Sequence, residues 1–169
     1  MTDTRRPELA GTFGMVSSTH WLASATAMAM LEAGGNAFDA AVAAGFTLQV
    51  VQPHLNGPGG DLPLIFARAH DATPTVLCAQ GPAPGGATAE HFADLGLELI
   101  PGAGPLAATV PGATLGWLTL LRDHGTLELR DVLAHAISYS THGFPLVGDT
   151  VSRAISTVEN RTPGWSELL

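Results

Sequence analysis

The 169-residue chain contains no lysine. Its seven basic residues are all arginine, they face 15 Asp and Glu residues, and the formal net charge is −8. The arginines are scattered from Arg5 to Arg161 and form no basic stripe. Binding to nucleic acid or to an anionic membrane depends on clustered positive charge, so the sequence argues against both partners.

The chain is also poor in cysteine and in long apolar runs. The single Cys78 permits no internal disulfide, and its apolar neighbours predict a buried, inert thiol. No apolar run follows Arg5 and Arg6, so we expect neither a secretory signal nor an oxidising compartment. The most apolar stretch, 37–51, is shorter than the roughly 20 residues of a membrane span. A soluble, cytoplasmic protein is the expectation.

What the chain does have is apolar and glycine-rich. Hydrophobic residues make up 46% and charged residues 13%, with 20 Gly and 12 Pro. A typical charged fraction is about 25%. Such a chain is too apolar for disorder and has too little charge to cover itself. We expect a single segment that is mostly buried, preferably against further protein.

Cap and breaker residues predict the first elements. Residues 14–16 suggest a short strand, and the hydroxyl side chains of 17–19 are expected to cap a helix over about 20–33. Gly34 and Gly35 end that helix, since glycine adopts the left-handed conformation that follows a helix.

A second helix is expected over 37–51, with Asn36 as its cap and Asp39 near the positive end of its dipole. Its small and apolar residues occupy nearly every face. A helix of this kind is buried rather than amphipathic. We therefore place it at the centre of the domain.

Further along, 62–69 and 75–79 are expected to be two strands of a hairpin joined by the polar turn 70–74. Helices are expected over 88–95, 113–124, 129–139 and 147–158, with irregular chain over 96–112. This order favours a layered α+β domain over a parallel sheet.

Local motifs for chemistry are weak. The glycine loop 56–61 lacks the lysine of a phosphate-binding loop, so close backbone packing is the better interpretation. The seven histidines show no metal-ligand spacing, and we expect no metal. Ser18 and Thr19 beside His20 are better explained as helix caps than as a nucleophile with its base.

Several ordered landmarks carry a resemblance. They are Gly14 to His20, Gly34 to Ala43, Val50 to His54, Gly57 to Asp61, Val110 to Ala113, Gly116-Trp117 and His142 to Pro145. This series, which runs from residue 14 to about 165, closely resembles the opening of the γ-glutamyltranspeptidase family.

The resemblance implies an N-terminal nucleophile hydrolase: a four-layer αββα sandwich made as a precursor that cleaves itself into a large and a small subunit. The nucleophile would be the threonine that begins the small subunit, with its own amine as base and no cofactor. Residues 14–169 would be the first part of the large subunit, after a polar arm over 1–13. The implied partners are the rest of that subunit, the small subunit and a small amide substrate. No catalytic residue would lie in this chain, which alone would be inactive.

One departure from the family bears on substrate choice. The large subunit of true γ-glutamyl enzymes supplies an arginine for the substrate carboxylate, in the loop after the second hairpin strand. Here Gln80 stands at or near that place, followed by Gly81 and Pro82. A neutral amide cannot form the bidentate pair of a guanidinium. We therefore take Gln80, Gly81 and Pro82 as candidate substrate-binding residues, and place the chain nearer to the amidohydrolases and acylases of this family.

Two other functions stay open from the sequence. The chain could be a non-catalytic remnant or interaction scaffold of the same fold, because its apolar surface suits binding to another chain. A nucleotide-binding module built on the glycines of 57–60 is a distant third, for want of lysine.

Overall fold

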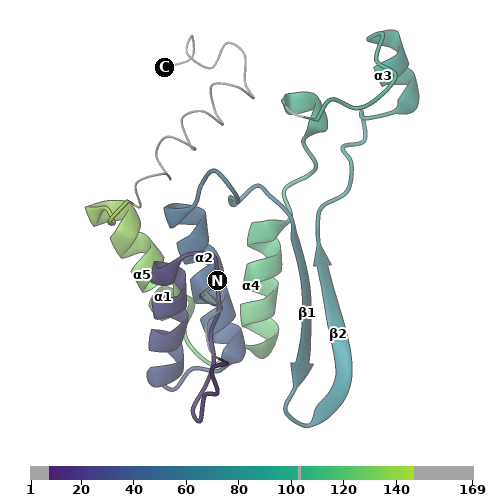
Figure 1. Ribbon diagram of the computed structural model, residues 1–169. Helices are drawn as coiled ribbons and strands as arrows, with labels where there is room; N and C mark the ends of the chain where they lie inside the picture. Colours follow the sequence, from purple (N-terminus) through teal and green to yellow (C-terminus); the bar gives the residue numbers. More distant parts are fainter. Residues whose placement is uncertain (1–7, 103, 147–169) are drawn as a thin grey trace, which may run out of the picture.

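The computed structural model describes residues 8–102 and 104–146. Over these residues, helices pack beside one antiparallel hairpin, which confirms the expected α+β class (Figure 1). The elements are α1 (Trp21–Glu32), α2 (Ala37–Val51), β1 (Leu62–Arg68), β2 (Asp71–Ala79), α3 (Ala89–Asp94), the 3₁₀ turn η1 (Pro105–Ala107), α4 (Ala113–His124) and α5 (Leu129–His142). The helix expected over 147–158 lies outside the described residues.

The corner between α1 and α2 forms as the sequence predicts. Gly34 has φ of 90°, a conformation that costs a glycine nothing. The Asn36 side chain accepts hydrogen bonds from the N–H groups of Phe38 and Asp39, and the Asp39 carboxylate accepts one from the Asn36 N–H. This reciprocal capping box fixes the first turn of α2.

The start of α1 differs from expectation. His20, not a hydroxyl residue, caps the helix: its Nδ1 accepts a hydrogen bond of 3.2 Å from the Leu22 N–H. The Ser18 hydroxyl does not cap the helix. It donates to the His20 carbonyl and lies 2.7 Å from the Ser24 hydroxyl. The strand predicted over 14–16 is also wrong. Those residues are irregular and pair with no strand among the described residues.

Helix α2 lies at the centre of the helical layer, as predicted. It packs against α1, α4 and α5, and its Val42 and Ala43 are completely buried. Leu120 of α4 and Val132 of α5 complete this core. α5 runs on to His142, beyond the end expected at 139. The run of small residues on α2 lets its neighbours approach closely, which is why an apolar helix with modest side chains can hold the layer together.

The hairpin flanks α4, with one face against the helices and one face outward (Figure 1). Leu64, Phe66 and Leu77 pack against the helical core. The register pairs Pro63 with Cys78 and Ile65 with Val76 on the outward face.

Two features of the loops were not expected. β2 begins at Asp71 rather than at Thr75, so the turn is tighter than predicted and Pro74 lies within the strand. An edge strand tolerates this proline, because the missing N–H need not pair with a neighbour. Beyond β2, α3 projects away from the helical layer, and the stretch 96–112 contains the short turn η1 (Figure 1).

Candidate functional site

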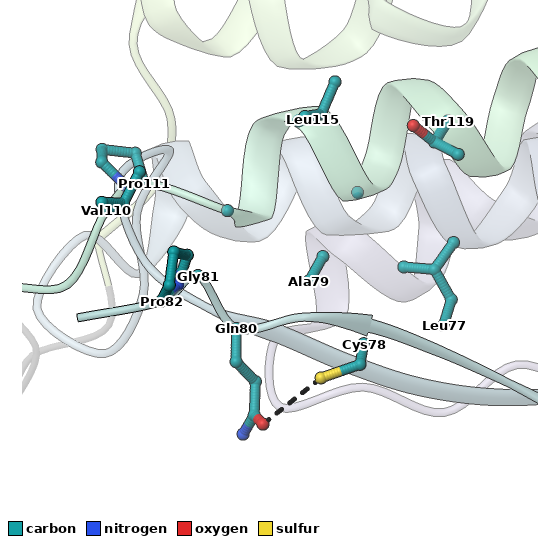
Figure 2. Close-up of a pocket in the computed structure, with 12 residues that line it drawn as sticks. Leu77, Cys78, Ala79, Gln80, Gly81, Pro82, Val110, Pro111, Leu115 and Thr119 are labelled. Atoms are coloured by element: carbon teal, nitrogen blue, oxygen red, sulfur yellow. Dashed lines mark hydrogen bonds between the residues drawn. The ribbon is translucent and has the colours of Figure 1, made fainter. Parts of the chain in front are cut away.

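The three candidate substrate-binding residues lie together at the end of β2. Gln80, Gly81 and Pro82 follow the last strand residue and line a cleft of about 610 Å³ (Figure 2). Its opposite wall is the segment 110–112 and the first turns of α4. The sequence therefore located one wall of this cleft and missed the other.

Glycines hold the two walls at their separation. Gly81 has φ of 74°, and a Cβ there would overlap the Val110 carbonyl oxygen. A Cβ at Gly112 would likewise overlap the Ala79 carbonyl oxygen. The Val110 N–H donates a 3.0 Å hydrogen bond to the Pro82 carbonyl. The end of β2 and segment 110–112 thus touch backbone to backbone, an approach that a side chain would prevent.

The loop 57–61 anchors the start of α4. The Gly60 carbonyl accepts hydrogen bonds from the N–H groups of Gly112, at 3.2 Å, and Ala113, at 2.9 Å. These bonds satisfy N–H groups at the helix start, where the side chain of a cap residue is missing. The expectation of close packing is wrong for Gly57 and Gly59, because a Cβ at either position would meet no atom within 4 Å.

The lining of the cleft is uncharged. Its aliphatic lining comes from Leu77, Pro82, Val110, Pro111 and Leu115. Its polar lining residues are Thr119 and, at the strand end, Cys78 and Gln80, whose side chains turn to the outward face of the hairpin. No Asp, Glu, Arg or His lies among these described lining residues. A charged ligand group would lose water here without gaining an ion pair, so the cleft favours neutral groups.

The side chain of Gln80 leaves the strand end on the outward face of the hairpin. The Cys78 thiol donates a 3.5 Å hydrogen bond to the Gln80 Oε1, and both side chains point away from Leu115 and Thr119 of α4 (Figure 2). The amide NH₂ group of Gln80 therefore keeps its capacity to donate to a ligand. The prediction of a buried Cys78 is wrong: residues 77 and 79 face the helices, so the pleat turns 78 outward.

The described part of the chain does not support the other candidate sites that the sequence raised. The His20 ring accepts from a backbone N–H rather than from Ser18 or Thr19, so no nucleophile–base pair forms there. Within residues 8–102 and 104–146, no group of three or more His, Cys, Asp or Glu side chains is placed to hold a metal ion. Of the helices that the structure describes, none has the length and apolar character to cross a bilayer.

Pro111, Leu115 and Thr119 were missed as lining residues. The sequence marks Val110 to Ala113 as a landmark, but nothing local shows that it meets the end of β2. That pairing joins residues some 30 positions apart, since Val110 donates to Pro82. The one local signal was the glycine at 112 next to a proline, which marks a close approach without naming the partner.

Comparison with known proteins identifies relatives of this chain. The family model for gamma-glutamyltranspeptidase matches residues 23–169. The chain is 39% identical over 150 residues to the glutathione hydrolase-like YwrD proenzyme of Bacillus subtilis, covering 88% of this chain and 28% of the relative. It is 39% identical over 165 residues to the oxamate amidohydrolase proenzyme of Klebsiella pneumoniae, covering 92% of this chain and 30% of the relative.

A solved structure agrees with these relatives. The structure of LmbA2991HD superposes with a TM-score of 0.84 at 58% identity, covering 91% of this chain and 27% of that one. The chain thus spans less than a third of the length of each of these proteins. The match covers most of this chain, both strands of the hairpin and the residues that line the cleft included, and the chain belongs to the gamma-glutamyltranspeptidase family.

Proposed function

We propose that this chain forms part of a γ-glutamyltranspeptidase-like amide hydrolase or acyltransferase whose nucleophile is an N-terminal threonine on another segment. Membership of the family supports the reaction class. Two relatives are named as proenzymes, which fits a precursor that is processed into subunits. The proposed partners are the remainder of the large subunit and the small subunit. The cytoplasm is the proposed location.

In the proposed reaction, the threonine hydroxyl attacks the amide carbonyl carbon while the free α-amine of the same residue takes the hydroxyl proton. The carbon–nitrogen bond breaks, the amine leaves with that proton, and an acyl ester remains on the threonine. Water or an acceptor amine then releases the acyl group. Hydrogen-bond donors of the other subunit would stabilise the oxyanion, and this chain would bind the acyl side of the substrate.

The outward face of the hairpin supports the proposed four-layer sandwich. Ile65 and Val76 pair across the strands there, with 69% and 68% of their surfaces exposed. A second sheet packed about 10 Å away would bury this face. Residues 14–169 would then be one side of an αββα domain, with α1, α2, α4 and α5 as an outer layer.

The cleft at the end of β2 is the observation that carries the proposal. Its lining holds no charged side chain among the described residues. At the strand end, the Gln80 side chain lies on the outward face of the hairpin, at or near the place where the resemblance puts the arginine of a γ-glutamyl enzyme. We propose that the substrate is an amide whose acyl part lacks the α-amino acid head group of glutamate. A charged hydrogen-bonded pair contributes about 1.5–3 kcal/mol, so its loss weakens γ-glutamyl binding roughly ten- to a hundredfold.

The test is the Gln80→Arg variant of the complete, processed protein, assayed with a γ-glutamyl anilide and with neutral acyl anilides. We expect kcat/KM for the γ-glutamyl anilide to rise at least tenfold and that for the neutral anilides to fall. Ala83→Arg adds the same charge to an exposed position of the same loop outside the cleft lining and should change neither value. Wild-type affinity for glutamate equal to that of the arginine variant would contradict the substrate proposal.

A second experiment tests where the catalytic residues lie. Residues 1–169 alone, repurified to constant specific activity, should hydrolyse none of these anilides. Sustained hydrolysis by this chain alone would contradict the proposal that the nucleophile belongs to another segment.

A further inference from the structure

A second cleft, of about 420 Å³, lies between α2, the loop 52–61 and the start of α4. It shares no lining residue with the cleft at the end of β2. The proposed function does not use it. Its lining combines one indole, one carboxylate and side-chain amides with the aliphatic side chains of Leu48 and Leu55.

Trp117 supplies the indole, and α2 is shaped to receive it. A Cβ at Gly45 would lie 2.5 Å from both Cε2 and Cζ2 of the ring. Alanine at that position would displace the indole, so the bare backbone of Gly45 lets the ring rest against α2. The aromatic ring is thereby supported by a helix rather than by a loop.

Asp61 supplies the charge. It is the one ionisable side chain among the described residues that line this cleft. Of the described arginines, Arg122 and Arg130 pair with their neighbours Asp123 and Asp131. Arg68 lies beside Asp71 at the far end of β1 from Asp61, so none of the three pairs with Asp61 in the described part of the chain.

The polar groups around Asp61 favour a donor as ligand. Asn56 directs its amide NH₂ to the carbonyls of Leu48 and Gln52, which leaves its Oδ1 as an acceptor. An anion finds little here, because the N–H groups of Gly112 and Ala113 at the start of α4 already donate to the Gly60 carbonyl. Asp61 would repel an anion as well.

We propose that this cleft binds an organic ammonium ion, with Asp61 pairing its charge and Trp117 contacting it through the ring. Cations are attracted to the electron-rich face of an indole, and Asp61, an exposed residue of the same cleft, supplies the opposite charge. Gly57 lines the same cleft, and a Cβ there would meet no atom within 4 Å. This site is independent of the proposed amide chemistry.

The test is calorimetric titration of the complete protein with ethylammonium chloride and with tetramethylammonium chloride, at constant ionic strength. We expect saturable binding that Asp61→Asn weakens at least tenfold and Trp117→Phe weakens severalfold. Asp94→Asn removes the same charge from exposed helix α3, outside the cleft, and should bind like wild type. Absence of saturable binding to wild type, or equal binding by Asp61→Asn, would overturn the proposal.

A second readout covers the case in which a variant at position 61 fails to fold. In wild-type protein with ¹⁵N-labelled tryptophan, either cation should shift the indole N–H resonance of Trp117 and leave that of Trp21 in place. A Trp117 resonance that does not move at saturating cation would equally overturn the site.

Discussion

The helical layer and the hairpin are both apolar, yet they differ in how much they bury. Leu120 and Val132 of the helices have 1% and 0% of their surfaces exposed, whereas Ile65 and Val76 of the hairpin have 69% and 68% exposed. The helices surround α2 on several sides. The hairpin has helices on one side only among the described elements. Hydrophobic content therefore does not decide burial; the number of neighbouring layers does.

Leu120→Ala should produce the largest loss of stability, because it opens a cavity in the core of the helical layer. Such truncations cost about 2–5 kcal/mol. Leu115→Ala on the same helix removes the same atoms from a side chain that is 69% exposed, and should cost less than about 0.5 kcal/mol. Urea unfolding of the complete protein measures both. Similar losses of stability for the two variants would contradict the assignment of Leu120 to the core and of Leu115 to the exposed cleft.

Asp39→Asn should destabilise the same layer by about 2–3 kcal/mol. The carboxylate is fully buried and accepts hydrogen bonds from the N–H groups of Asn36, Thr126 and Leu127 and from the Thr126 hydroxyl. It thus joins the start of α2 to the turn between α4 and α5. Asparagine keeps the size of the side chain but loses the charge and one strong acceptor.

The same residue predicts an effect of acid. Burial raises the pKa of Asp39, but the hydrogen bonds from Thr126, Asn36 and Leu127 together outweigh it and hold the pKa below its usual value. The ionised form therefore stabilises the fold above about pH 3.9, the unfolded value, and this contribution is lost as the pH falls through the lower folded pKa. Acid unfolding of Asp39→Asn should lack this component. An unchanged acid transition would contradict it.

His20 predicts a smaller effect at milder pH. Burial lowers the pKa of its imidazole, so the folded chain favours the neutral ring, whose Nδ1 caps α1. Stability is complete above about pH 6.5, the unfolded value, and declines as the pH falls below it towards the folded pKa. His20→Ser keeps a cap that does not titrate. We expect this variant to lose the slope between pH 7 and 5, and a slope equal to that of wild type would contradict the role.

The double variant Ile65→Thr, Val76→Thr should change the stability of the helical layer least. In residues 1–169 expressed alone, both side chains face water, and threonine keeps the strand preference. We expect less aggregation in size-exclusion chromatography with little change in amide protection of α2. In the complete protein, the same pair should weaken subunit assembly. Normal assembly would show that no second sheet covers this face.

Much of the fold could be predicted from local signals. Gly34, Asn36 and Asp39 define the corner between α1 and α2 through backbone freedom and capping, which act within a few residues. The apolar stretches 62–69 and 75–79 around the polar turn 70–74 predicted the hairpin. Two local predictions were wrong. The His20 ring, rather than a hydroxyl group, caps α1, and strand pairing extends β2 back through Pro74 to Asp71.

The candidate site was harder, because its two walls come from distant residues. Gln80 was identified by its departure from a family pattern, and Cys78, which was expected to be buried, is exposed. The contacts between Gly81 and Val110, and between Ala79 and Gly112, depend on how α4 docks against the hairpin. No local sequence pattern predicts how α4 docks against the hairpin.

By itself, the sequence determined the family, the capped helical corner and the uncharged character of the segment after β2, because each depends on residue identity or on neighbours along the chain. The tertiary structure decided which segment lies against the end of β2, which groups donate hydrogen bonds to Asp39, and that Trp117 and Asp61 share a cleft. These are contacts between elements far apart in sequence. They are set by packing, which requires all the layers to be in place.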